Sequence, residues 1–137
     1  MLDLDFVITV HDEIIQELGG LPGFAGGGYG AVQAALQRVA FHAEYAGLDD
    51  VLGIAALYAE AIARGHVFND GNKRTGLTCA LAYLEQQGIH VKNDPVLEDL
   101  MVALAVGNFP RDDFAWALGA LAGLHQYPRE APAEGDL

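Results

Sequence analysis

Residues 66–88, HVFNDGNKRTGLTCALAYLEQQG, decide the fold because they join a polar loop to an apolar helix. The segment from 75 to 84 carries no charge. Its leucines recur at the spacing of one helical face, at Leu77, Leu81 and Leu84. The remaining faces are also apolar, which predicts a helix surrounded by protein. Gly88 follows where a C-terminal cap is expected.

The polar part, residues 66–74, contains groups that suit an anion. The first turn of a helix offers unpaired N–H groups and the positive end of the helix dipole. Gly71 lets the backbone approach a ligand closely. Lys73 and Arg74 add positive charge, and arginine can bind phosphate with two parallel hydrogen bonds. Asn72 can cap the helix that follows.

Two more side chains of this loop suit transfer of a phosphate group. Asp70 offers oxygen ligands of the kind that Mg²⁺ prefers, and Mg²⁺ often accompanies phosphates. Histidine is the residue type best suited to act as a general base near neutral pH, and His66 supplies one. A base, a metal ligand and a phosphate clamp so close together predict phosphoryl or nucleotidyl transfer.

Composition limits the partners. The 137 residues fit one domain, and a net charge of −12, from 19 acidic and 7 basic residues, argues against direct binding to nucleic acid. Arg64, Lys73 and Arg74 lie within eleven residues, which favours an anionic ligand over a local cluster of ion pairs.

No run of apolar residues is long enough to span a membrane, and no signal peptide is recognised. We expect a cytoplasmic protein.

The single cysteine, Cys79, excludes a disulfide framework and fits a reducing compartment. It lies among apolar residues of the predicted helix. Two interpretations are open: a nucleophile beside His66, or a small core residue, which we favour.

Helical spacing and capping signals recur along the whole chain and predict about six helices. The first begins near Asp5 or at a weak Thr9 capping pattern, and ends at residues 19–20. The second spans residues 31–45 and closes at Gly47. The others run from Asp49 or Asp50 to 64, over 75–84, from the pair 94–95 to 107, and from 110 onward. We therefore predict an all-α helical bundle over residues 1–124 and a disordered tail over 125–137.

Residues 19–30, GGLPGFAGGGYG, contain seven glycines in twelve positions and cannot form regular structure. They are either a flexible connector or a flap beside the site, since mobile loops often carry binding roles.

The segment 66–74 resembles the Fic motif, histidine-x-Phe-x-acid-Gly-Asn-x-Arg, and ARGHVFNDGNKRT at 63–75 resembles the Doc (death-on-curing) toxins. The resemblance runs from about Phe6 to Leu124 and includes HDEI at 11–14 and GGLPG at 19–23. It implies the all-helical Fic/Doc fold, with the motif loop at the N-terminus of a central helix, and it favours the flap interpretation of residues 19–30.

The resemblance also implies which group is transferred. Most Fic proteins move AMP from ATP to a protein hydroxyl, and they carry Gly where this chain has Lys73 and a second Arg where it has Leu77. Both departures match Doc, which implies transfer of the γ-phosphate of ATP to a Ser/Thr hydroxyl of elongation factor Tu, arresting translation. Two alternatives are an AMP transferase with the same site and a non-catalytic binding module of the same fold.

The implied roles attach to the motif residue by residue. His66 is the catalytic base and Asp70 holds Mg²⁺, while the phosphates of ATP lie against Gly71, Asn72, Lys73 and Arg74. For three residues in or near the motif, two interpretations of the side chain stay open. Phe68 anchors the loop in the core or contacts nucleotide; Asn69 forms a turn or a polar contact; Arg64 ends its helix as a surface charge or faces the site or target.

Toxins of this type are neutralised by a partner. Some Fic proteins carry an inhibitory helix with the pattern Ser/Thr-x-x-x-Glu-Gly/Asn; Thr9 and Glu13 fit its first part, but Ile14 does not fit its last position. We therefore expect a separate antitoxin of the Phd type, whose disordered C-terminal segment folds into a groove between helices.

Overall fold

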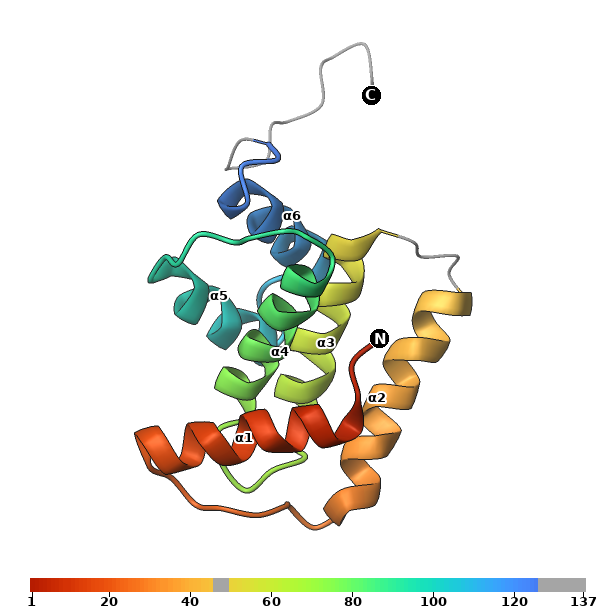
Figure 1. Cartoon of the computed structure of the whole chain (residues 1–137), viewed down its shortest axis with the longest axis vertical. Coiled ribbons are helices and arrows are strands. Elements are labelled where there is room, and N and C mark those ends of the chain that lie inside the picture. Colours follow the sequence, from red (N-terminus) through yellow and green to blue (C-terminus); the bar gives the residue numbers. More distant parts are fainter. Residues whose placement is uncertain (46–49, 126–137) are drawn as a thin grey trace.

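The computed structural model describes residues 1–45 and 50–125, and these fold into six α-helices (Figure 1). They are α1 (Leu4–Leu18), α2 (Gly28–Tyr45), α3 (Val51–Gly65), α4 (Asn72–Gln86), α5 (Val96–Ala105) and α6 (Arg111–Leu121). The described residues contain no strand, only one isolated bridge between Phe24 and Phe68. The prediction of an all-α bundle is confirmed. None of the helices in the described ranges is long and apolar enough to cross a membrane.

The helices α3 and α4 form the centre of the bundle, with α1 across one end, α6 at the opposite end, α2 on one side and α5 on the other (Figure 1). The side chains of Cys79, Ala80 and Leu84 on α4 are fully buried, as the apolar segment predicts. Gly76 sets the spacing of the pair: a Cβ atom at this position would lie 2.8 Å from the carbonyl oxygen of Ala59 on α3. Only glycine permits this close approach without a shift of α3.

The first helix begins next to Asp5, one of its two predicted starts, whereas α2 and α4 begin about three residues earlier than the sequence predicts. The first starts at Leu4, as the Asp5 alternative predicts and the Thr9 alternative does not, because Asp3 caps it: the Asp3 side chain accepts a hydrogen bond of 3.2 Å from the backbone N–H of Asp5. The second starts at Gly28, inside the glycine-rich segment, rather than at Ala31. The predicted end at Gly47 lies outside the described residues.

The remaining boundaries follow the capping signals closely. Asp50 caps α3 through a 3.1 Å bond from the N–H of Leu52, and Gly88 has the left-handed conformation (φ 79°) typical just after a helix. The Asp94 side chain accepts a hydrogen bond of 2.9 Å from the N–H of Val96, as expected for the start of α5. The predicted Asn72 cap is wrong: Asn72 is the first residue of α4, and its side chain makes no cap bond.

Of the predicted tail, only His125 lies within the described residues. Its ring stacks on Trp116 of α6 at 3.6 Å, and its Nε2 atom lies 2.6 Å from the Trp116 carbonyl oxygen. His125 therefore packs on the helical domain. Residues 126–137, the rest of the predicted tail, lie outside the described part of the chain.

Candidate functional site

His66 directly follows α3 and has left-handed backbone angles, φ 45° and ψ 45°. It is the only non-glycine residue in the described ranges with a positive φ. Such a conformation costs roughly 1–3 kcal/mol, and it persists where the surrounding structure imposes it. The residue is exposed, and its ring has no hydrogen-bond partner among the described residues. The imidazole is therefore accessible to a protein substrate.

The carboxamide of Asn72 closes the loop that follows. Its Oδ1 atom accepts a hydrogen bond from the N–H of Phe68, and its Nδ2 atom donates one to the carbonyl oxygen of Phe68, both of 3.0 Å. The Phe68 ring is 2% exposed and belongs to the core. Phe68 thus anchors the loop, as one of its two interpretations holds, and it offers almost no surface to a nucleotide.

The glycine-rich segment lies directly on this loop. The N–H of Ala25 donates to the carbonyl oxygen of Val67, and the N–H of Asn69 donates to that of Gly23, both at 3.0 Å. The Asn69 side chain also donates to the Pro22 carbonyl oxygen at 3.0 Å. In Figure 1 the orange segment after α1 runs back beneath that helix to reach the loop between α3 and α4. Residues 22–25 are therefore bound to the site, as the flap interpretation predicts, and Asn69 holds them there.

His11 of α1 supports the loop from within. Its ring is 1% exposed and stacks on the Phe68 ring with centroids 3.7 Å apart and planes 6° apart. Its Nε2 atom lies 2.7 Å from the backbone carbonyl oxygen of Asp70. His11 is thus a packed histidine whose side chain also fixes the motif loop. The signal in the sequence was its place in the HDEI stretch.

The exposed Asp70 carboxylate lies where the loop meets α4. One oxygen accepts from the N–H of Gly71 and the other from the N–H of Leu21 on the glycine-rich segment, both at 3.2 Å. No group of three or more His, Cys, Asp or Glu side chains in the described ranges is placed to hold a metal. A single accessible carboxylate fits Mg²⁺, which usually keeps several waters and binds one or two carboxylates together with substrate phosphates.

The first turn of α4 begins at Gly71, whose φ of 76° strains any other residue, and whose Cβ would meet Ile15 Cδ1 at 3.2 Å. Lys73 and Arg74 are exposed. Arg74 makes an ion pair of 3.8 Å with Glu98, and both side chains are more than half exposed, so this pair is weak and can open for a ligand.

A cavity of about 320 Å³ opens beside this turn, between α1, α4 and α5. It is lined by Ile14, Leu18, Lys73, Arg74, Leu77, Thr78, Glu98, Met101 and Val102. Lys73 and Leu77, the two positions that depart from the AMP-transferring pattern, therefore both face the same space as Arg74.

Two predicted candidates lie away from the loop. Arg64 turns toward α5: its Nε atom donates to the Leu104 carbonyl oxygen at 3.0 Å, and its guanidinium pairs with Glu60 at 3.4 Å. Cys79 is fully buried, and burial raises the pKa of its thiol to about 12. A thiol with that pKa stays protonated at neutral pH, so Cys79 is a core residue and not a nucleophile.

Comparison with known proteins identifies the family of this chain. The family model described as the Fic/DOC family matches residues 1–84, more than half of the chain. The chain belongs to the Fic/Doc family. It is also 39% identical, over 117 residues, to the protein kinase Doc of Escherichia phage P1; the match covers 85% of this chain and 91% of the phage protein. The residues matched by the family model include the loop between α3 and α4.

Proposed function

We propose that this protein is a Doc-type toxin: a protein kinase that transfers the γ-phosphate of ATP to a Ser/Thr hydroxyl of elongation factor Tu and so arrests translation. Its 39% identical relative in phage P1 is named a protein kinase, and the match covers most of both chains. The elongation factor is the family's recognised target, and it enters here as the expected substrate.

The observation that carries the proposal is the lining of the cavity beside α4. Lys73, Arg74 and Leu77 share it, so two cations stand at one end and an apolar wall stands where AMP-transferring relatives place a second arginine. Leucine offers no hydrogen bond to phosphate, and the lysine side chain narrows the space at the helix N-terminus where an α-phosphate would bind. Both features favour a reversed nucleotide, with its γ-phosphate toward His66.

In this arrangement each residue of the loop has a separate role in the transfer. The free imidazole of His66 takes the proton of the target hydroxyl, whose oxygen attacks the γ-phosphorus while the bond to the β-phosphate oxygen breaks and ADP leaves. Gly71, Asn72, Lys73 and Arg74 hold the phosphates at the α4 N-terminus. Asp70 would hold Mg²⁺, which when bound would neutralise charge on the phosphate oxygens.

We expect inhibition by an antitoxin of the Phd type whose C-terminal segment folds into the cavity between α1, α4 and α5. Leu18 and Val102 at its edge are 58% and 50% exposed, which is apolar surface that a folded segment would cover. Because the same cavity contains Lys73 and Arg74, a bound segment would compete with nucleotide. A synthetic antitoxin segment should therefore raise the apparent KM for ATP.

The deciding experiment is to incubate the purified protein with elongation factor Tu, ATP and Mg²⁺, and to weigh the intact target. A mass gain of one phosphoryl group is the expected result. A gain of one AMP would overturn the reversed nucleotide and make the protein an AMP transferase. If wild type and the His66→Ala variant both left the target unchanged, this target would be wrong, and a non-catalytic binding role would gain support.

The His66→Ala variant also tests the base. Loss of a general base lowers the rate by roughly 10²–10⁴-fold. Because the side chain is exposed and makes no hydrogen bond to a described residue, its removal should leave the fold intact. Phosphorylation of the target by His66→Ala at the wild-type rate would exclude His66 as the base.

A further inference from the structure

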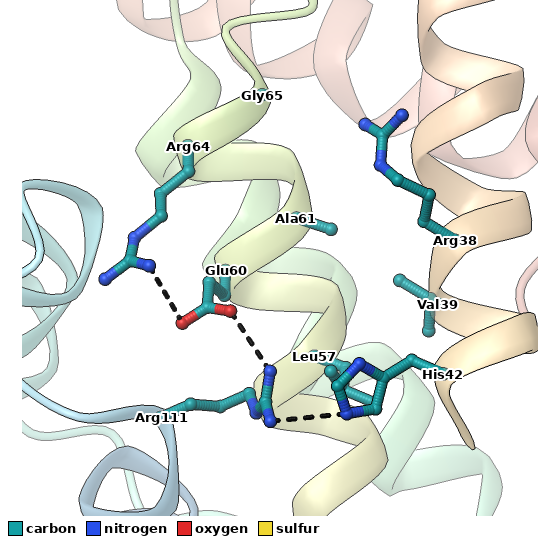
Figure 2. Close-up of a pocket in the computed structure, with 9 residues that line it drawn as sticks. All are labelled: Arg38, Val39, His42, Leu57, Glu60, Ala61, Arg64, Gly65 and Arg111. Carbon is teal, nitrogen blue, oxygen red and sulfur yellow. Dashed lines mark hydrogen bonds and ion pairs between the residues drawn. The ribbon is translucent and has the colours of Figure 1, made fainter. Parts of the chain in front are cut away.

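A second cavity, of about 280 Å³, lies between α2, α3 and the start of α6 (Figure 2). It is lined by Arg38, Val39, His42, Leu57, Glu60, Ala61, Arg64, Gly65 and Arg111. The side chains of Val39, Leu57 and Ala61 give it apolar surface, and the charged side chains surround that surface (Figure 2). The proposed transfer reaction uses none of its charged groups.

Positive charge is concentrated here. The whole chain has 7 basic residues against 19 acidic ones, yet Arg38, Arg64 and Arg111 all line this one cavity. Glu60 pairs with two of them: its Oε2 atom lies 3.4 Å from Arg64 and its Oε1 atom 3.2 Å from Arg111. Asp112 does not line this cavity; it lines a neighbouring hollow together with Glu60, Arg64 and Arg111.

One cation of the cavity is left without a counter-charge. No hydrogen bond or ion pair joins Arg38 to any residue that the structure describes, and in Figure 2 its guanidinium extends from α2 toward the end of the cavity at Gly65. His42, one turn along α2, has its Nε2 atom 3.4 Å from Arg111. One carboxylate therefore stands among three guanidinium groups, and the site has capacity for a second carboxylate.

The position of the cavity indicates what binds there. Gly65 lines it, and the next residue is His66. A protein segment with a carboxylate at Arg38 would thus place its neighbouring residues beside the base. We propose that this cavity binds an acidic side chain of the target protein, close in sequence or space to the hydroxyl that is phosphorylated. This rests on the proposed kinase function and adds a charge preference for the target.

The first test uses direct binding and does not depend on catalysis. A fluorescent peptide containing several glutamates should bind the wild-type protein at least about tenfold more tightly than its glutamine counterpart, because charge-assisted bonds to arginine are the stronger ones. Arg38→Glu should abolish this difference and Arg38→Lys should keep part of it. Lys92→Glu, an equal change of charge at an exposed residue outside the cavity, is the matched control and should bind like wild type.

The second test separates binding of the target from chemistry. For phosphorylation of elongation factor Tu, Arg38→Glu should raise the KM for the target at least about tenfold while kcat and the KM for ATP stay at wild-type values. Thermal unfolding checks that the variant folds. Lys92→Glu should change none of these constants.

Three results would overturn the proposal. One is equal binding of the glutamate and glutamine peptides, which would reduce the cavity to an ion-pair cluster. Another is an unchanged target KM in Arg38→Glu. The third is loss of antitoxin binding in Arg38→Glu with target binding intact, which would assign the cavity to the antitoxin. If wild type phosphorylates no elongation factor at all, the proposed function fails by itself, and the peptide arm still decides whether the cavity binds carboxylates.

Discussion

The Nε2 atom of His11 lies 2.7 Å from the backbone carbonyl oxygen of Asp70, although 59 positions separate the two residues. Since a carbonyl oxygen only accepts, Nε2 carries the hydrogen of this bond. The same ring is stacked on Phe68. One buried side chain of α1 therefore fixes the backbone between the candidate base, His66, and the candidate metal ligand, Asp70.

We predict that His11→Ala slows phosphoryl transfer by roughly 10–10²-fold, because a displacement of about 1 Å at a reacting group has effects of this size. It also leaves the Asp70 carbonyl oxygen without its partner, which should lower stability by about 1–3 kcal/mol. His11→Gln, which can donate to the same oxygen, should recover part of the rate. Rate measurements beside urea unfolding of the three proteins check this, and wild-type transfer by His11→Ala would contradict it.

The Asn72 side chain both accepts from and donates to Phe68, so substitutions that keep its shape should separate these bonds. Asn72→Asp can still accept from the N–H of Phe68, but it cannot donate and it adds negative charge at the phosphate site. We expect Asn72→Asp to weaken ATP binding more than Asn72→Ala does, whereas only Asn72→Ala, which removes the acceptor, should speed hydrogen exchange at the Phe68 amide. Tighter ATP binding by the aspartate variant would exclude a phosphate near Asn72.

The sequence predicts a helix boundary well where the residues that set the boundary lie within a few positions of it. The cap Asp50 and the glycine at 88 act within a few residues, and the sequence predicts them; Asp94 also bonds the start of α5, although the N-cap itself is Pro95, one residue later than predicted. The start of α2 was predicted too late because Gly28, which sits among glycines, is nevertheless the first helical residue. Local propensity gives no account of it.

In the site, too, local features can be predicted from the sequence, whereas contacts between distant segments cannot. The positions of Gly71, Lys73 and Arg74 at the start of α4 follow from the motif and the apolar segment after it. The support by His11 and the pairing of residues 23 and 25 with the motif loop join segments more than forty positions apart. The alternation of apolar and polar residues predicts faces of helices, but not which residue of a distant helix meets a given carbonyl group.

Two glycines of the helices should respond in opposite directions to alanine. Gly76→Ala brings a Cβ to 2.8 Å from the Ala59 carbonyl oxygen and forces α3 and α4 apart, which should cost about 1–3 kcal/mol. Gly30 of α2 has nothing within 4 Å of an added Cβ, so Gly30→Ala should stabilise the protein by about 0.5–1 kcal/mol. Urea unfolding of the pair checks this, and destabilisation by both would mean that α2 needs its glycine for another reason.

Burial of Cys79 should make the protein less stable at alkaline pH. Its thiol pKa rises from 9.0 to about 12 because the thiolate is desolvated, and burial likewise raises the pKa of Tyr58 and Tyr83. The stabilising effect of the neutral thiol is complete below the unfolded pKa and is lost as pH rises from 9 toward 12, since the unfolded chain releases this proton first. The loss is at most about 1.4 kcal/mol per pH unit for this group.

Cys79→Ala removes this titration and leaves those of the tyrosines. The variant should be less stable than wild type at neutral pH, because it leaves a small cavity between α3 and α4. Its stability should nevertheless fall less steeply above about pH 9. Urea unfolding at about pH 8 and about pH 10.5 measures the two slopes. Equal slopes would mean that the folded protein already ionises Cys79 at the higher pH, and the thiol would then react with iodoacetamide in the native state, which a fully buried thiol does not.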